Sequence, residues 1–256
     1  MLQTRTHRHS AHRRATPTLR EARSIARRLT RAFAGIDAIC LYGSVARGNA
    51  TEWSDIDLLV TGSNPRLTPE RLRRAVSGRG SGRLSLIYYP TTTFRERYAN
   101  RALFIAHVKK EGIALFDRLH LLKEVLTSPF VPEVDVDDGV RTHLARLAPY
   151  TDSSRFGDNF LFCLSHLYSI GKGIVMLGIA KTGTLEFSRD AAFEAFERLN
   201  PDLRFEIKKI TILRPFYHLV TGRQPEPLPF SYRDADGPMR EAVTAIRLLA
   251  RRAQSG

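Results

Sequence analysis

Apolar residues in the first half of the chain follow two periods, one helical and one strand-like. From Leu19 to Phe33 they recur every three or four residues, behind a Thr18–Glu21 spacing typical of a capping box, and predict a helix that Gly35 ends. Short apolar runs bounded by Gly, Pro or Asp predict buried strands. We expect strands at 38–42, 55–60 and 84–89, an apolar run at 113–116, helices at 69–76 and 102–110, and a turn at 77–82.

The pattern changes after about residue 128, where Pro129 and Pro132 bracket a link. Helical periods dominate from there, and helices are expected near 139–149, 156–179, 188–199, 203–221 and 235–253. This predicts an α+β protein in which a small mixed β-sheet domain flanked by helices precedes an α-helical bundle domain. The expected divisions are a basic disordered tail at 1–16, the sheet domain at 17–128 and the bundle at 129–256.

Residues 160–180 form the most apolar stretch, but they include Ser165, His166 and Lys172. A membrane span needs ~20 mostly apolar residues, so we interpret the stretch as a buried bundle helix and expect no membrane partner. Two cysteines, Cys40 and Cys163, are too few for a disulfide framework. That usage favours a reducing, cytoplasmic setting.

Charge narrows the choice of partners. The 256 residues carry 40 Lys and Arg against 26 Asp and Glu, a formal net charge of +14. Nine arginines and a single acid, Glu21, lie in residues 1–33. Such a field favours polyanions, so RNA is an expected partner, although a solubilising arm explains the N-terminal arginines equally well.

Two carboxylates stand two positions apart in the second predicted strand, at Asp55 and Asp57. Side chains alternate along a strand, so both should point to one face. Two like charges ~4 Å apart in a partly buried site repel by about 4 kcal/mol, and a divalent cation removes that repulsion. Oxygen ligands with room for phosphate and water suit Mg²⁺ or Mn²⁺, and the same pair could hold two ions.

A Gly43-Ser44 turn ends the preceding strand. Glycine permits close backbone approach, Ser44 offers a hydroxyl, and the N–H groups of such a turn can bind phosphates. The order of strand, Gly-Ser turn and Asp-x-Asp on a second strand therefore predicts a site for a nucleoside triphosphate and a metal ion.

The stretch from GSVARG to SDIDLLV resembles the DNA polymerase β-like nucleotidyltransferase superfamily, and within it the bacterial minimal and kanamycin nucleotidyltransferase-like branches. The likeness is closest over residues 36–60 and extends loosely to about 117, while the helical half resembles the bundles that follow such domains. The resemblance implies metal-dependent transfer of a nucleoside monophosphate from an NTP to a hydroxyl, with release of pyrophosphate. The charge of +14 favours an RNA 3′ end or a protein as acceptor over a cationic aminoglycoside.

By that motif, Gly43, Ser44 and Arg47 would bind the nucleotide, and Asp55 and Asp57 would be the catalytic residues that bind Mg²⁺ or Mn²⁺. A phosphate-adjacent position is one interpretation of Arg47. A salt bridge to a nearby acid is the other.

One position departs from the family, which usually carries a third carboxylate on the third strand, where this sequence has Ser85. Serine is no base near pH 7 and a poor metal ligand. Either a carboxylate from elsewhere replaces it, with Glu52, Glu111 and Asp158 as candidates, or the protein is a catalytically weakened, antitoxin-like partner that binds nucleotide or RNA.

Weaker signals lie elsewhere. We interpret His107 and Glu111 as a surface pair on one helical face, Trp53 as a loop-packing residue rather than a base-stacking platform, and Gly171-Lys172-Gly173 as a helix-packing segment rather than a phosphate loop. A basic nucleic-acid-binding protein whose sheet motif is accidental is the remaining interpretation.

Overall fold

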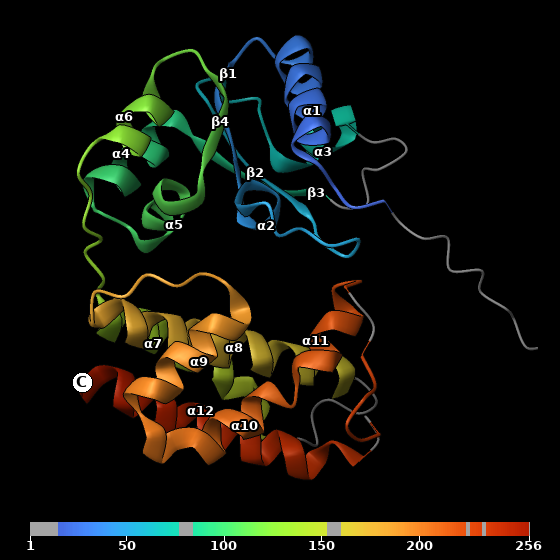
Figure 1. Ribbon diagram of the computed structural model, residues 1–256, viewed down its shortest axis with the longest axis vertical. Coiled ribbons are helices and arrows are strands. Elements are labelled where there is room, and N and C mark those ends of the chain that lie inside the picture. The colour runs from blue at the N-terminus through green and yellow to red at the C-terminus, as the bar shows by residue number, and fades with distance from the viewer. Residues whose placement is uncertain (1–14, 77–83, 153–159, 224–225, 232–233, 256) are drawn as a thin grey trace, which may run out of the picture.

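The structure is a computed structural model that describes residues 15–76, 84–152, 160–223, 226–231 and 234–255. Most of the predicted tail and the predicted turn at 77–82 lie outside these ranges. The described chain forms two halves, a sheet with its helices and a cluster of helices, joined through the segment that follows residue 127 (Figure 1). The prediction of an α+β fold is confirmed.

The first half is built around a four-stranded mixed sheet in the order β3-β2-β1-β4. Strand β2 pairs in parallel with β3, and β1 pairs antiparallel with both β2 and β4. The elements are α1 (Leu19–Ala32), β1 (Ile36–Tyr42), α2 (Gly43–Arg47), β2 (Ile56–Gly62), α3 (Pro69–Val76), β3 (Leu84–Pro90), α4 (Thr91–Ala99), α5 (Leu103–Glu111), β4 (Ile113–Asp117) and α6 (Leu121–Thr127).

The alternation of side chains along β1 and β2 gives the sheet two buried faces. Ile39, Leu41 and Leu58 belong to a core shared with α1 and α3, whereas Cys40 and Leu59 belong to a core shared with α4, α5 and α6. The sheet is therefore a middle layer between two layers of helices, as Figure 1 shows.

The second half is helical and has a core of its own, which runs from Val136 to Ala253. Its helices are α7 (Val136–Leu147), α8 (Phe160–Lys181), α9 (Arg189–Leu199), α10 (Arg204–Thr211), α11 (Arg214–Val220) and α12 (Asp236–Ser255), with short 3-10 turns at Ala148–Thr151 and Pro201–Leu203. Helix α8 packs against α7, α9, α11 and α12. It is long and apolar enough to cross a membrane by length and composition, and half of its most apolar window is buried in this bundle.

Several local predictions are confirmed. The Thr18 hydroxyl accepts a hydrogen bond from the Glu21 N–H (3.2 Å) and caps α1. Side chains on Gly171 and Gly173 would overlap Ile210 and the His143 ring, so these glycines do allow helices to pack closely. The cap was predictable because it joins residues three positions apart. The close packing was predictable because it requires glycine.

Other predictions are wrong in detail. Asp55 lies just before β2, which begins at Ile56, rather than inside the strand. The helix expected over 203–221 is two helices, because the chain turns at Ile212 and Leu213 and α11 begins at Arg214, with Pro215 in its first turn. Helices α4 and α6 were not expected: the TTTFRERYA segment has almost no amphipathic period, and α6 has only seven residues.

Candidate active site

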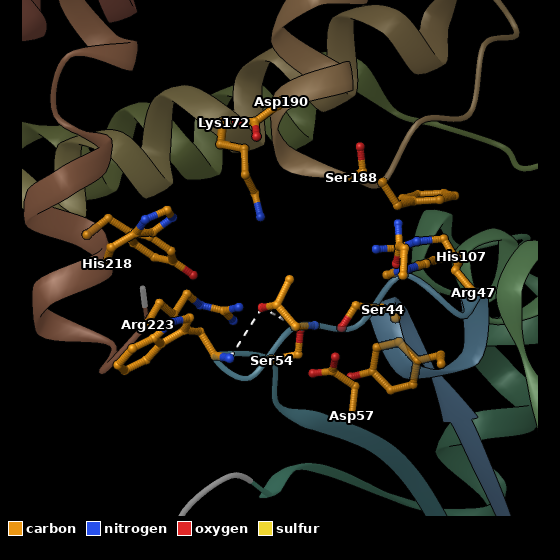
Figure 2. A pocket seen from close by; sticks show the side chains of 17 residues that line it. Ser44, Arg47, Ser54, Asp57, His107, Lys172, Ser188, Asp190, His218 and Arg223 are labelled. Carbon is orange, nitrogen blue, oxygen red and sulfur yellow. Dashed lines mark hydrogen bonds between the residues drawn. The ribbon is translucent and has the colours of Figure 1, made fainter. Parts of the chain in front are cut away.

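A pocket of about 450 Å³ lies between the two halves, and both line it. The sheet half contributes the turn after β1, the start of β2 and one face of α5. The helical half contributes side chains from α8, from the start of α9 and from the end of α11. Figure 2 shows these side chains converging from opposite sides, among them Ser44, Asp57, Lys172, Asp190, His218 and Arg223.

The Gly43-Ser44 turn lies against the Asp57 carboxylate. Gly43 has φ +75°, in the left-handed region that favours glycine, and begins the short helix α2. A Cβ on Gly43 would overlap the Asp57 carboxylate, so only glycine lets the turn and the carboxylate approach this closely. Ser44 is half-buried and lines the pocket beside them.

Asp57 lies on the middle one of three neighbouring strands. In the strand register it is opposite Tyr42 at the end of β1 and opposite Ser85 on β3. Burial raises the pKa of Asp57, the Ser85 hydroxyl donates a hydrogen bond that lowers it, and the Asp55 charge raises it further. The net pKa lies above the usual value of 3.8, because the surroundings compensate this charge incompletely.

Asp55 reaches across to the helical half. Its carboxylate accepts a hydrogen bond from the Arg223 guanidinium (3.0 Å), and both side chains are about three-quarters buried, with 26% and 20% of their surfaces exposed. Arg223 also lowers the pKa of Asp57. The two aspartates therefore share one cationic neighbour, which places their charges near each other and near the pocket.

Ser85 on β3 occupies the position where a third carboxylate was expected. It is directly opposite Asp57 in the parallel register and bonds to that side chain. Among the described residues, no group of three His, Cys, Asp or Glu side chains is arranged to hold a metal ion. Glu52 is half-buried in the loop before β2, and Asp158 lies outside the described residues. The described donor set is thus limited to two carboxylates.

Glu111 cannot supply the missing carboxylate as it stands, because Arg47 and His107 hold it. Its side chain is only 3% exposed and forms ion pairs with Arg47 and, at 3.0 Å, with His107. The prediction of a surface pair is therefore wrong: this face of α5 packs against α2 and against Phe187, whose ring stacks on His107 at 4.3 Å. Arg47 lines the pocket and is anchored by this buried acid.

The pH response of this cluster follows from its contacts. Burial raises the pKa of Glu111, but hydrogen bonds and charges from His107 and Arg47 outweigh burial, so the net pKa lies below its usual range. Glu111 is consequently ionised at neutral pH and keeps the Arg47 side chain at the pocket wall.

The helical half adds residues that sequence reasoning missed. Lys172 extends from α8 into the pocket, and Arg223 and His218 approach from the end of α11 (Figure 2). His218 pairs with Glu226 (3.0 Å), and Asp190 at the start of α9 pairs with Arg214 (3.0 Å). Apart from the Gly171-Lys172-Gly173 segment, which we interpret as helix packing, no local motif surrounds these residues, so the sequence did not connect them with Gly43 and Asp57. Trp53 also lines the pocket.

Comparisons with known proteins agree with this architecture. Residues 19–136 match the family described as the nucleotidyltransferase domain. A spectinomycin adenyltransferase from Enterococcus faecialis, whose structure contains ATP and spectinomycin, has a similar fold, with TM-score 0.51 and 15% identity over 91% of this chain and 98% of its own. A nucleotidyltransferase-like protein from Exiguobacterium sibiricum aligns with TM-score 0.37 and 15% identity over 90% and 74% of the two chains. No curated protein sequence matches this chain.

Proposed function

We propose, from the premise that residues 19–136 form a nucleotidyltransferase domain of the DNA polymerase β-like superfamily, that this protein transfers a nucleoside monophosphate from an NTP to an acceptor hydroxyl. In that reaction the acceptor oxygen bonds to the α-phosphorus, the bond from that phosphorus to the β-phosphate oxygen breaks, and pyrophosphate leaves. The pocket between the two halves is the site of transfer.

One observation carries the proposal: a glycine turn with positive φ presses against a buried strand carboxylate inside a pocket walled by cations. The turn offers N–H groups and the Ser44 hydroxyl to phosphate oxygens. Arg47, Lys172 and Arg223 line the opposite walls and supply positive charge for a polyphosphate. This arrangement suits a triphosphate better than a neutral metabolite.

The two aspartates fit a divalent cation. The pKa of Asp57 is raised by burial and by the Asp55 charge, and Ser85, Arg223 and His107 offset these effects only in part, so a further positive charge would stabilise its ionised form. Two carboxylates leave coordination positions for phosphate oxygens and water, which suits Mg²⁺ or Mn²⁺. Bound there, the ion would polarise the phosphoryl group and stabilise the charge that develops during transfer.

The protein's own residues bind and orient. The Gly43-Ser44 turn and Arg47 hold the nucleotide on the sheet side, with Glu111 fixing the Arg47 guanidinium. Lys172 and Arg223 approach from the helical side and neutralise the leaving pyrophosphate. Proximity and charge neutralisation are the main contributions that a protein can make to phosphoryl transfer.

We further propose that the acceptor is an RNA 3′ end or a protein hydroxyl rather than an aminoglycoside. The neighbour from Enterococcus faecialis is a spectinomycin adenyltransferase, but its likeness supports the fold alone. Here the formal net charge is +14, a field that attracts polyanions and disfavours a cationic acceptor.

The test is transfer of label from α-³²P NTPs to cell RNA or protein in Mg²⁺ or Mn²⁺. We expect Asp57→Asn to reduce transfer by at least ~10³-fold, because it removes a ligand that stabilises transition-state charge. Asp138→Asn is the matched control, since it removes an exposed carboxylate from α7 and should leave the rate unchanged. Absence of transfer to every acceptor class with both metals would contradict the proposal.

Ser85 favours a second candidate, a protein that binds nucleotide without transferring it. General-base assistance contributes ~10²–10⁴-fold to such reactions, so its absence slows transfer without preventing binding. Tight, Asp57-dependent NTP binding combined with no transfer under any condition would favour this second candidate over the first.

A further inference from the structure

Helices α1 and α3 present a continuous arginine surface on the outer side of the sheet. The two helices pack side by side there, as Figure 1 shows, and the Arg28 guanidinium donates to the Ala75 carbonyl (3.3 Å) between them. Every arginine of the two helices is exposed. These arginines are Arg20, Arg23, Arg27, Arg28 and Arg31 on α1 and Arg71, Arg73 and Arg74 on α3. Below, this set is called the arginine face.

The packing of α1 and α3 keeps these arginines on the outside of the molecule. Ala22, Ile25 and Leu29 of α1 are buried against the sheet, as are Leu72 and Val76 of α3. Neither helix can turn its arginines inward without exposing that apolar stripe. The arginine face is therefore as rigid as the core beneath it.

Little local charge compensates the arginine face. Glu21 and Glu70 are the only acids in the sequences of the two helices. The ion pair between Glu70 and Arg73 is long, 3.9 Å, and both side chains are about half exposed or more. Arg28 and Arg71 donate to backbone carbonyls, which orient a guanidinium without cancelling its charge.

The helical half provides a contrast within the same molecule. Arg214 pairs there with Asp190 and Glu226, Arg240 with Asp236 and Arg252 with Asp202. Carboxylates match these cations of the helical half, whereas on the arginine face the ion pair between Glu70 and Arg73 is a long one. The eight arginines and two acids of α1 and α3 leave a formal charge of +6 on this side of the sheet, out of +14 for the chain.

We propose that the arginine face binds the phosphate backbone of an RNA strand, at a surface separate from the pocket. Arg20, Arg23, Arg27 and Arg31 follow one another at three- and four-residue steps, which gives about one guanidinium per helical turn along the ~21 Å of α1. A row of this kind matches a polymer of phosphates rather than a single anion, because each guanidinium can bind phosphate oxygens in a bidentate manner.

A lipid surface fits the arginine face less well. Interfacial helices insert an apolar side among the lipid chains, but the apolar sides of α1 and α3 are buried in the core. The exposed large hydrophobic residues of the described chain all lie outside these two helices. The face also lacks exposed aromatic side chains, so we expect it to bind backbone with little sequence preference.

The experiment is fluorescence anisotropy with a labelled, unstructured 20-nucleotide RNA and the full chain, without nucleotide or divalent metal. Because transfer is not measured, the result is independent of the proposed reaction. The test variant is the triple Arg23→Gln, Arg27→Gln, Arg31→Gln, chosen because glutamine is a good helix former. The matched control is the triple Arg141→Gln, Arg247→Gln, Arg251→Gln, which removes the same charge from exposed positions of the helical half. Far-ultraviolet circular dichroism checks that both variants fold.

Each phosphate contact to a single strand contributes ~0.7 to the slope of log K against log salt. Loss of three contacts should lower that slope by about 2 and weaken RNA binding about a hundredfold at ~0.1 M salt. The control triple should bind within about twofold of the wild type. Single-stranded DNA of the same sequence should compete, because the contacts are to phosphates.

Three outcomes would overturn the proposal. The first is an unchanged salt slope in the test variant. The second is an equal loss of RNA affinity in the control variant, which would mean that only the net charge of the protein matters. The third is tighter, arginine-dependent binding to phosphatidylserine vesicles than to RNA.

Discussion

At the scale of single residues, Gly43 and Gly48 form a natural matched pair. Both have φ +75°, but a Cβ on Gly43 would overlap the Asp57 carboxylate, whereas a Cβ on Gly48 would have nothing within 4 Å. We expect Gly48→Ala to cost about 1–2 kcal/mol of unfolding free energy from backbone strain alone. Gly43→Ala should cost more and should also weaken NTP binding at least tenfold, because Asp57 must move.

Urea denaturation and equilibrium nucleotide titration measure the two effects separately. If Gly43→Ala and Gly48→Ala weakened NTP binding equally, the close contact between the turn and Asp57 would not determine the affinity of the site.

Ser85 offers a test of the absent carboxylate. Ser85→Asp places a third negative group opposite Asp57, so in metal-free buffer like-charge repulsion should lower the melting temperature by a few degrees. Mg²⁺ should restore it. If acceptor activation limits the reaction, transfer should rise by ~10²–10⁴-fold, while Ser85→Asn, equal in size but uncharged, should give no gain.

Calorimetry with and without Mg²⁺, together with the labelling assay, follows both effects. A Ser85→Asp protein that gains neither metal-dependent stability nor transfer would show that position 85 lies outside the reacting centre.

At the scale of elements, Glu111 joins α5 to α2 through its ion pair with Arg47, and Glu111→Gln should remove that ion pair. We expect a loss of about 1–3 kcal/mol at pH 7, because the buried acid is hydrogen-bonded to the Arg47 guanidinium and to the His107 ring. The folded-state pKa of Glu111 is lowered from 4.5, so its contribution is present above that value and is lost as pH falls through the folded pKa. The gap between wild type and variant should therefore narrow as the pH falls below 4.5.

Denaturation curves at pH 7 and pH 3.5 measure this gap, with Glu241→Gln, at an exposed position of α12, as the control that should change neither curve midpoint. A gap that widened in acid would mean that the Glu111 carboxylate destabilises the fold.

The elements also show which features the sequence could reveal. Helix α1 and strands β1 to β3 were predictable because their apolar periods are long and their caps and turns are local. The adjacency of Gly43 and Asp57 was predictable from a strand–turn–strand pattern. The Arg47–Glu111 pair was not determined by pattern, because the residues are 64 positions apart and only packing of α5 against α2 brings them together. Helix α4 escaped prediction because its segment lacks an amphipathic period.

At the scale of the whole molecule, the pocket exists only because two separately cored halves face each other. Sequence patterns describe each half, but they carry no signal for which side chains of one half will meet the other. Lys172 shows the limit: it was assigned correctly to a packed helix, between Gly171 and Gly173, yet its side chain reaches a site formed by the other half. Arg223, which follows the left-handed Gly222, could be connected with Asp55 only by folding.

The Asp55–Arg223 pair makes metal binding and contact between the halves competing events. A cation that binds Asp55 without nucleotide must displace a guanidinium that bonds to it at 3.0 Å. Removing this partner with Arg223→Gln should therefore tighten Mn²⁺ binding in the absence of nucleotide. A partly exposed ion pair contributes up to about 1 kcal/mol, which corresponds to about a two- to fivefold gain. NTP affinity should change in the opposite direction, because a phosphate partner is lost.

Isothermal titration of Mn²⁺ and of NTP measures both shifts. Lys172→Gln is the matched control, since it removes a positive charge from the same pocket while leaving the Arg223–Asp55 bond in place. It should weaken NTP binding as well but raise Mn²⁺ affinity less than Arg223→Gln. Equal gains in Mn²⁺ affinity would mean that the overall pocket potential, and not the bond between the halves, opposes the metal. A larger gain in Mn²⁺ affinity for Arg223→Gln than for Lys172→Gln, together with weaker NTP binding in both, would mean that nucleotide and metal bind best together, since the phosphates give the displaced guanidinium a new partner.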